Sequence, residues 1–150
     1  MRLTTKGRYA VTAMLDIALY SSDKPVSVQD IAQRQNISAA YLEQIVRRLK
    51  QAALLSSHRG PGGGYLPGKD LGAISVSDII AAVGEGVDAT RCGGTADCHD
   101  GQVCLTHDLW SDLSAQIDSF LQSVTLQALV DTRTPQLPAM LQRISTVQMP

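Results

Sequence analysis

The chain has 150 residues and a mass of 16.0 kDa, which suits one ordinary domain or a small domain with an appended segment and excludes two large catalytic lobes. Hydrophobic residues make up 44% of the sequence but aromatic residues only 4%, so the core must consist mainly of Leu, Ile, Val and Ala, which favours helices. The net charge of -1 hides an asymmetry, because residues 1–70 carry ten Lys and Arg against five Asp and Glu, whereas residues 71–150 carry three against nine. The first half could therefore meet nucleic acid, which the second half would repel.

The N-terminus places basic residues ahead of an apolar run, as a secretory signal does, but Asp16 interrupts the run and no small-residue cleavage pattern follows. No stretch approaches the roughly 18 apolar residues that a membrane helix needs. We therefore expect a soluble, cytoplasmic protein with no membrane partner.

The first half of the chain predicts three helices. Apolar residues behind Thr5 recur at helical spacing, and Thr5 is placed to cap a mostly buried first helix. Ser27 precedes an acidic residue by three positions, a capping-box signal for a short second helix that Asn36 would end in a tight turn. Ser38 can cap a third helix, whose apolar positions are Leu42, Ile45, Val46 and Leu49.

A glycine-rich turn follows the third helix. Residues 54–58 and 65–66 look extended, and the run 60–64 between them must turn, because neither a helix nor a strand tolerates that composition. Two helices joined by a short turn and followed by a Gly-tipped hairpin predict a winged helix-turn-helix. A fourth helix is expected from Ser75 or Ser77 to about residue 83.

The next segment, residues 84–106, has no periodicity and holds all three cysteines with five of the twelve glycines. Such a segment cannot order itself by burying apolar surface, so something else must hold it. An amphipathic helix of about four turns follows, and its apolar seam suits a contact between two helices. We expect this helix to form a dimer through Trp110, Leu113, Ile117, Phe120, Leu121 and Val124.

These elements together predict a mainly α fold with a small β-hairpin wing, in which a winged helix-turn-helix is joined to a long dimerisation helix. The DNA-binding domain is expected in residues 1–83 and a metal-binding loop in residues 84–106. Residues 107–131 would form the dimerisation helix and a short following helix. Prolines and weak periodicity predict a flexible tail over residues 132–150.

Three cysteines and a histidine form the strongest chemical pattern in the sequence. Cys92, Cys98, Cys104 and His107 give C-x5-C-x5-C-x2-H, four soft or borderline ligands on a flexible loop that ends at a helix start. Incidental thiols prefer buried cores, whereas these lie among Gly, Asp and Thr, and an odd number would leave one thiol of a disulfide framework unpaired. Zinc accepts such a Cys3His set, while a [2Fe-2S] cluster also takes four protein ligands and can accept histidine. The five-residue spacers are long for zinc, which favours the cluster only slightly.

The polar face of the third helix predicts a contact with DNA. Its first residues are small enough to approach a groove closely, Tyr41 and Gln44 could reach base edges or phosphates, and Glu43 could accept from a cytosine amino group. The basic end of the helix and the wing at Arg59 support the same interpretation. The glycine run beside Arg59 lacks the ending of a P-loop and the pattern of a dinucleotide fold, so it does not indicate an enzyme. The candidate DNA contacts are Arg2, Lys6, Ser38, Ala39, Ala40, Tyr41, Glu43, Gln44, Arg47, Arg59 and Gly60.

Several stretches of the chain resemble one family of bacterial regulators. They are MRLTTKGRYAVTAM at residues 1–14, ISAAYLEQ at 37–44, RGPGGGY at 59–65, DATRC at 88–92 and CLTHDLW at 104–110, and together they span about residues 1–130. The family is that of the winged-helix transcription regulators that sense iron-sulfur clusters. The resemblance implies a homodimer with one [2Fe-2S] cluster per subunit, whose ligands are Cys92, Cys98, Cys104 and His107.

The resemblance further implies that the protein binds double-stranded DNA and that cluster occupancy controls genes for iron-sulfur cluster assembly, with the assembly machinery as a cluster donor. A two-fold dimer would read an imperfect palindrome with half-sites about 10 base pairs, or a multiple, apart. The alternative is a Cys3His zinc-binding module that recognises RNA or protein. An enzyme is not expected, because no cofactor fingerprint or acid-base pair accompanies the metal ligands.

Overall fold

Helix α1 (Thr5–Tyr20) lies at the centre of the fold. The computed structural model describes residues 3–133, and in it α1 packs against α2, α3, α4, α6 and the second strand of the wing. The cap of α1 is Thr4 and not Thr5, because the Thr4 hydroxyl accepts the Gly7 N–H at 3.1 Å. The buried face has the helical spacing that the sequence predicted, with Ala10, Ala13, Met14 and Ile17 fully buried.

Helices α2 (Val28–Gln35) and α3 (Ala39–Gln51) form the predicted helix-turn-helix. Ser27 caps α2 by accepting the Asp30 N–H at 3.1 Å, and Ser38 caps α3 in the same way at 3.4 Å. Asn36 adopts the left-handed conformation with φ 53°, which reverses the chain between the two helices as predicted. The buried face of α3 consists of Leu42, Ile45, Val46 and Leu49.

Strands β1 (Leu55–His58) and β2 (Gly64–Pro67) pair antiparallel and form the wing. Val26, just before α2, adds a backbone bridge to β2. Its N–H donates to the Tyr65 carbonyl at 3.0 Å, and its carbonyl accepts the Tyr65 N–H at 2.8 Å. Only glycine fits at position 64, since a Cβ there would lie 2.4 Å from the Val26 carbonyl oxygen. The wing is therefore anchored to the helix-turn-helix through main-chain contacts.

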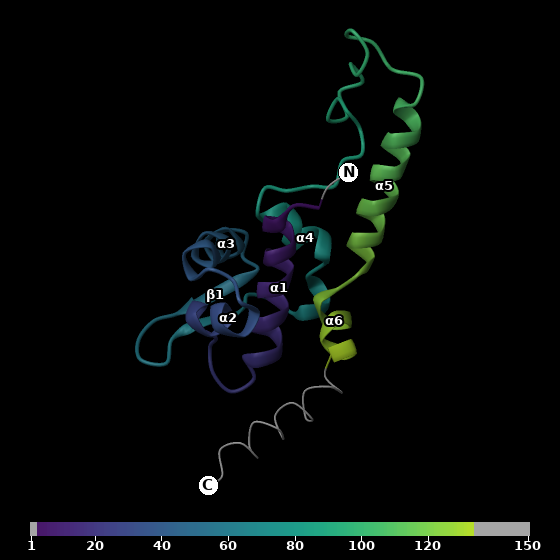
Figure 1. Cartoon of the computed structure of the whole chain (residues 1–150). Helices are drawn as coiled ribbons and strands as arrows, with labels where there is room; N and C mark the ends of the chain where they lie inside the picture. The colour runs from purple at the N-terminus through teal and green to yellow at the C-terminus, as the bar shows by residue number, and fades with distance from the viewer. Residues whose placement is uncertain (1–2, 134–150) are drawn as a thin grey trace.

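Helix α4 (Val76–Ala82) follows a short 3-10 turn, η1 (Leu71–Ala73), and begins with a capping box between Ser75 and Asp78. The chain then passes through the loop of residues 84–106 into α5 (His107–Ser123) and returns to α1 in α6 (Leu126–Arg133). Figure 1 shows α2, α3 and the hairpin on one side of α1, and α5 with the loop projecting on the other. None of the helices between residues 3 and 133 has the length and apolarity needed to cross a membrane.

Helix α6 belongs to the same core as the winged-helix elements. Leu126 is fully buried there, so the expected division after residue 83 does not follow the core. The helix also continues through Thr132 and Arg133, past the expected end at residue 131, because the Thr132 hydroxyl donates to the Ala128 carbonyl at 3.0 Å. The rest of the expected tail, residues 134–150, and the candidate DNA contact Arg2 lie outside the described residues.

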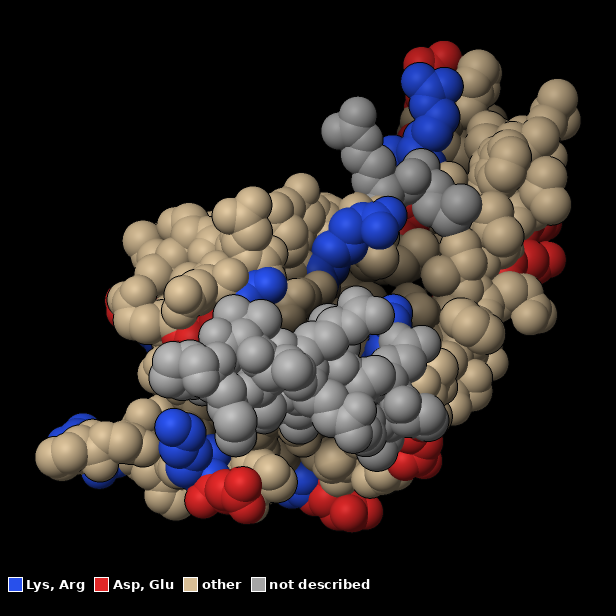
Figure 2. Space-filling model, turned by 60° about the horizontal axis from the view of Figure 1, so that its bottom comes forward, with Lys and Arg blue, Asp and Glu red and all other residues tan. Residues whose placement is uncertain are grey.

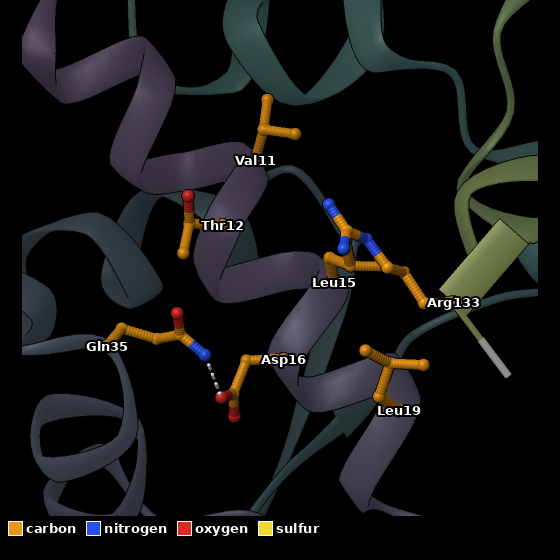
Figure 3. A pocket seen from close by; sticks show the side chains of 7 residues that line it. All are labelled: Val11, Thr12, Leu15, Asp16, Leu19, Gln35 and Arg133. Atoms are coloured by element: carbon orange, nitrogen blue, oxygen red, sulfur yellow. Dashed lines mark hydrogen bonds between the residues drawn. The ribbon is translucent and has the colours of Figure 1, made fainter. Parts of the chain in front are cut away.

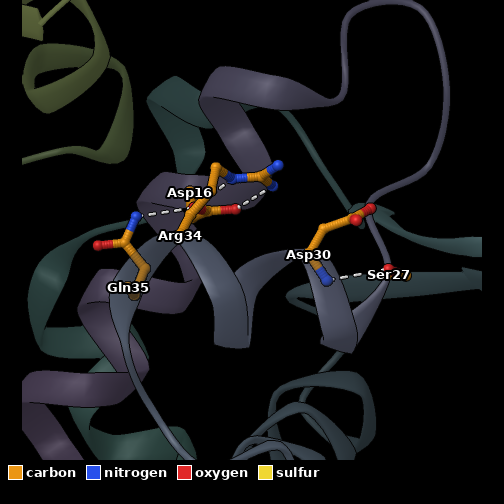
Figure 4. Close-up of polar contacts among 5 residues, drawn as sticks. All are labelled: Asp16, Ser27, Asp30, Arg34 and Gln35. Carbon is orange, nitrogen blue, oxygen red and sulfur yellow. Dashed lines mark hydrogen bonds and ion pairs between the residues drawn. The ribbon is translucent and has the colours of Figure 1, made fainter.

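A buried charge ties α1 to α2, and the sequence analysis did not identify it. The side chain of Asp16 is 0% exposed and accepts Arg34 Nη2 at 2.7 Å, Arg34 Nε at 3.0 Å and Gln35 Nε2 at 2.8 Å (Figure 4). The Arg34 guanidinium also lies 4.1 Å from the centroid of the Tyr20 ring. Hydrogen bonding to Asp16 raises the pKa of Arg34, so this arginine stays charged. The cluster fixes the position of α2 on α1.

Beside this cluster, a groove of about 440 Å³ lies between α1 and the end of α6. Figure 3 shows Asp16 and Gln35 on its wall together with apolar side chains of α1, and Arg133 on the opposite side. The buried carboxylate is therefore close to a space that is large enough to hold water.

Candidate metal centre and DNA interface

The loop of residues 84–106 and the start of α5 bring three of the four expected metal ligands together. His107 Nδ1 lies 3.5 Å from Cys92 Sγ and 3.6 Å from Cys98 Sγ. The ligand atoms of these three residues all lie within 4.8 Å of one another. His107 is the first residue of α5 and is buried, while the cysteines are half-buried free thiols. The helix start therefore presents the imidazole to the loop.

Cys104 borders this group without joining it. Its backbone N–H donates to Cys98 Sγ at 3.1 Å. Its own sulfur lies 3.9 Å from the Thr106 hydroxyl and is not among the three gathered ligand atoms. The fourth expected ligand is thus adjacent to the site, and its side chain also bonds to that of Cys98, which lowers the pKa of Cys104.

Polar contacts between near neighbours shape the loop. Asp88 accepts the Thr90 N–H at 2.8 Å, and the Thr90 hydroxyl in turn accepts the Gly94 N–H at 2.9 Å. The Ala89 N–H donates to Ser114 Oγ on α5 at 2.8 Å, which ties the loop to that helix. No residue between 84 and 106 is buried, so apolar burial does not hold this segment, as the sequence predicted. Ala96 even adopts φ 63°, a conformation that costs a residue with a side chain about 1–2 kcal/mol.

The surroundings of Cys92 favour its thiolate. Burial raises the pKa of this thiol, but hydrogen bonds from the backbone N–H groups of Ala96 and Gly94 and from Thr90 outweigh it, so the pKa falls to about 6. A thiolate near neutral pH is the form that binds metal. Cys92 is therefore prepared as a ligand by the turns of the loop itself.

The distances between the ligand atoms suit a bound metal. A sulfur at about 2.3 Å and a nitrogen at about 2.0 Å from one tetrahedral metal are about 3.5 Å apart. His107 Nδ1 lies 3.5 and 3.6 Å from the two sulfurs, close to that value. Three thiols and one imidazole are a donor set for zinc and for an iron-sulfur cluster. By composition the donor set fits either group, and the distances from His107 Nδ1 are those of donors around a single metal ion.

The exposed face of α3 carries most of the expected DNA contacts, and the wing carries two more. Arg59 and Gly60 are exposed at the tip of the wing, where Gly60 has φ 104°. Lys6 and Ala39 are half-buried, and so is Tyr41, whose ring meets the Tyr9 ring edge-on with centroids 5.8 Å apart. Tyr41 therefore also packs against the core. The candidate contacts of α3 and its cap that are exposed are Ser38, Ala40, Glu43, Gln44 and Arg47.

Basic side chains on one face of the molecule lie apart from one another. On the face seen in Figure 2, Lys and Arg form separate groups, and Asp and Glu lie between and beside them. Among the residues that are not drawn in grey, this face therefore shows no single broad basic patch.

The residues expected to form the dimer seam on α5 differ in their exposure. Leu113, Ile117, Leu121 and Val124 are half-buried, whereas Phe120 is 65% and Trp110 39% exposed. Leu121 lines a small cavity together with Ile80 of α4, and Ser77 Oγ donates to Asp118 at 2.8 Å, so one side of α5 packs on α4.

Two further apolar residues near the loop were missed in the sequence. Leu105 is fully exposed and Leu109 is 58% exposed. Leu109 stands four residues before Leu113, so the helical spacing could have included it. Together with Phe120 they leave apolar surface uncovered in a single copy of the chain.

Comparisons with known proteins agree with this architecture. The family model of Rrf2, described as an iron-dependent transcriptional regulator, matches residues 3–132. The chain is 59% identical over 133 residues to the HTH-type transcriptional regulator IscR of Yersinia enterocolitica, covering 89% of this chain and 81% of that one. It is 60% identical over 130 residues to IscR of Xenorhabdus nematophila, covering 87% and 79%.

Solved structures confirm the predicted fold class. CymR, the global cysteine regulator of B. subtilis, superposes with a TM-score of 0.76 at 32% identity and covers 88% of this chain and 98% of its own. The IscR of T. potens has a TM-score of 0.70 at 31% identity and covers 100% of this chain and 93% of its own.

Proposed function

Because the chain belongs to the Rrf2 family, it is a DNA-binding transcription regulator, and we propose that its DNA binding responds to a [2Fe-2S] cluster. The proposed ligands are Cys92, Cys98, Cys104 and His107. The observation that carries the proposal is the convergence of two thiols and His107 Nδ1 within 4.8 Å, in a loop that joins the winged-helix elements to α5. Such a cluster, when bound, supplies a redox-active iron centre held by protein side chains.

An iron-sulfur cluster is favoured over zinc by the family. The Rrf2 family is described as iron-dependent, and the donor set of three thiols and an imidazole suits a cluster as well as zinc. The alternative function, a zinc module for RNA or protein, is not favoured, because both the family and the fold are those of DNA-binding regulators.

The chain's own residues would couple the cluster to DNA by ordering the loop. Cys92 lies within the loop and His107 directly after its end, so filling the site would restrain the stretch between them. The hydrogen bond from Ala89 to Ser114 already joins the loop to α5. A coupling of about 1–3 kcal/mol, or 5- to 150-fold in affinity, is typical of such linkage and is reciprocal between the two ligands.

We infer that the regulator is a homodimer paired through the exposed apolar side of α5. Phe120 and Leu109 would be covered by the second copy. The dimer would present two α3 helices and two wings to an imperfect palindrome with half-sites about 10 base pairs, or a multiple, apart. Its proposed targets are genes for iron-sulfur cluster assembly, and the assembly machinery is the proposed source of the cluster.

Anaerobic purification followed by assays for iron, acid-labile sulfide and zinc tests the cofactor. We expect about two iron and two sulfide per subunit and a strong visible absorption, since a d10 zinc site is colourless. His107→Ala should lose the cluster, whereas His99→Ala, which changes a loop histidine outside the gathered ligands, should keep it. Stoichiometric zinc without sulfide would contradict the proposal.

The DNA response is tested with the loaded protein and its Cys92→Ala form on a panel of palindromic sites. We expect the two forms to rank the sites differently, and His107→Ala to rank them as Cys92→Ala does. One ranking with equal affinities for all three proteins would mean that the metal site is structural and carries no signal.

A further inference from the structure

Arg48 connects the helix that carries the candidate DNA contacts to the point where the metal-binding loop begins. Its Nη1 donates to the Val83 carbonyl at 3.4 Å, and Val83 is the fully buried C-cap residue that directly follows α4. Gly84, the next residue, opens the loop in the left-handed conformation with φ 75°. We propose that Arg48 is the positioning residue through which ordering of the loop changes the affinity of α3 for DNA. The inference rests on the proposed function.

The end of α4 is a suitable acceptor for this arginine. The Val83 N–H reaches the Ile80 carbonyl at 3.3 Å and the Gly84 N–H reaches the Ala81 carbonyl at 2.9 Å, which closes the last turn and leaves the Val83 carbonyl to Arg48. The carboxyl end of a helix carries partial negative charge, and this favours a cation there. The contact therefore caps α4 with a side chain from α3.

The junction is tight enough to transmit a small movement of the loop. A Cβ at Gly84 would lie only 3.0 Å from Arg48 Nη1, so the start of the loop passes directly against the guanidinium. On its other side α4 is bonded to α5, because Ser77 Oγ donates to Asp118 at 2.8 Å. The loop itself is held to α5 through Ser114. A change in the loop thus reaches Arg48 through residues that are already in contact.

The backbone of Arg48 belongs to the helix that carries the candidate DNA contacts. Arg48 directly follows Arg47, a candidate DNA contact, and lies in the last turn of α3. Within residues 3–133 its guanidinium makes one hydrogen bond, although arginine has five donors. When the loop is ordered, Arg48 holds this part of α3 against α4. When the loop is not ordered, the restraint weakens and α3 docks on DNA differently.

The test compares DNA affinity between the cluster-loaded protein and its Cys92→Ala form, measured anaerobically on one palindromic site. The comparison is made in the parent, in Arg48→Ala and in Gly84→Ala backgrounds. In both variants the affinity ratio between the two forms should move toward one by about 3- to 10-fold, the range of a single hydrogen bond. Gly84→Ala perturbs the same contact without removing positive charge from α3.

Arg47→Ala is the matched control, because it removes the same charge from the neighbouring exposed position. It should weaken both forms equally and leave their ratio unchanged. If Arg48→Ala keeps the same affinity ratio between the two forms as the parent, this inference alone is overturned. If the parent itself has an affinity ratio of one, the proposed function is overturned as well. Circular dichroism verifies that the variants are folded, and if Gly84→Ala is not, Arg48→Ala decides the question.

Discussion

Arg34→Ala should destabilise the protein far more than removal of an exposed arginine normally does. In the native chain the Asp16 side chain is 0% exposed and accepts two hydrogen bonds from Arg34 and one from Gln35. The variant keeps only the bond from Gln35. A carboxylate then remains inside the fold without its counter-ion.

The size of the effect follows from the burial of the pair. Removing one partner of a fully buried ion pair costs about 3–5 kcal/mol. The Arg34 side chain is 31% exposed, and the groove beside Asp16 has a volume of about 440 Å³, so solvent screens the carboxylate and reduces this cost. Loss of the contact with the Tyr20 ring adds about 0.5–1 kcal/mol. We expect the free energy of unfolding to fall by about 2–3 kcal/mol, which lowers Tm by roughly 6–12 °C.

Urea unfolding of the Cys92→Ala form, followed by circular dichroism, measures this change without a contribution from bound metal. Asp16→Asn combined with Arg34→Ala should recover part of the loss, since no uncompensated charge remains. Arg47→Ala, which removes an exposed arginine from the other helix of the helix-turn-helix, should stay within about 0.5 kcal/mol of the parent. The reasoning is refuted by a similarly small change for Arg34→Ala.

Three further predictions concern the dimer, the DNA contacts and the wing. Phe120→Asp should give a monomer in sedimentation velocity, because Phe120 is 65% exposed in one copy, and an unchanged mass would remove this side of α5 from the interface. Glu43→Ala should reduce the discrimination between bases at one cytosine-containing step by about 1–3 kcal/mol. Arg59→Ala should instead weaken binding to all DNA sequences and lower the slope of log affinity against log salt concentration by up to about one. Binding titrations on matched and mismatched sites separate the two effects. Equal losses of affinity on every site for Glu43→Ala would mean that Glu43 supports the fold and does not read a base. Gly64→Ala should lower the free energy of unfolding in urea by about 1–3 kcal/mol, because the new Cβ would lie 2.4 Å from the Val26 carbonyl oxygen. An unchanged midpoint would mean that the backbone bridge between Val26 and the wing accommodates the Cβ without cost.

Local chemistry was enough to predict the helix-turn-helix and to limit the start of α4 to Ser75 or Ser77, of which Ser75 is the cap. Ser27, Ser38 and Ser75 cap the helices that follow them, and Asn36 takes the left-handed turn, because each role depends on a few neighbouring residues. Thr4 was missed in favour of Thr5 since adjacent hydroxyls are equivalent candidates until the first helical N–H groups are placed.

Contacts between distant segments could not be predicted in this way. Asp16 was recognised only as an interruption of an apolar run, because nothing in its spacing indicates that Arg34 lies opposite to it. Leu126 stands in a short helix with weak periodicity, so its burial against α1 depends on the return of the chain. At the metal site, sequence spacing treats Cys104 as equal to the other cysteines, whereas in the folded chain its sulfur is not among the three ligand atoms that lie within 4.8 Å of one another.

The start of α4 and the start of α6 meet at the main chain. The Val76 N–H donates to the Val124 carbonyl at 2.9 Å, and the Leu126 N–H donates to the Ile74 carbonyl at 2.8 Å. The polypeptide therefore returns, after α4, the loop and α5, to the place where α4 begins. Within this closed stretch α4 packs on α1 and α3, whereas the loop contributes no buried residue. The loop can therefore lengthen, shorten or change its ligands over evolution while α4 and the rest of the globule keep their fold. An engineer who replaced the loop and α5 with a different sensor would have to keep α4 in order to retain the helix-turn-helix and its wing.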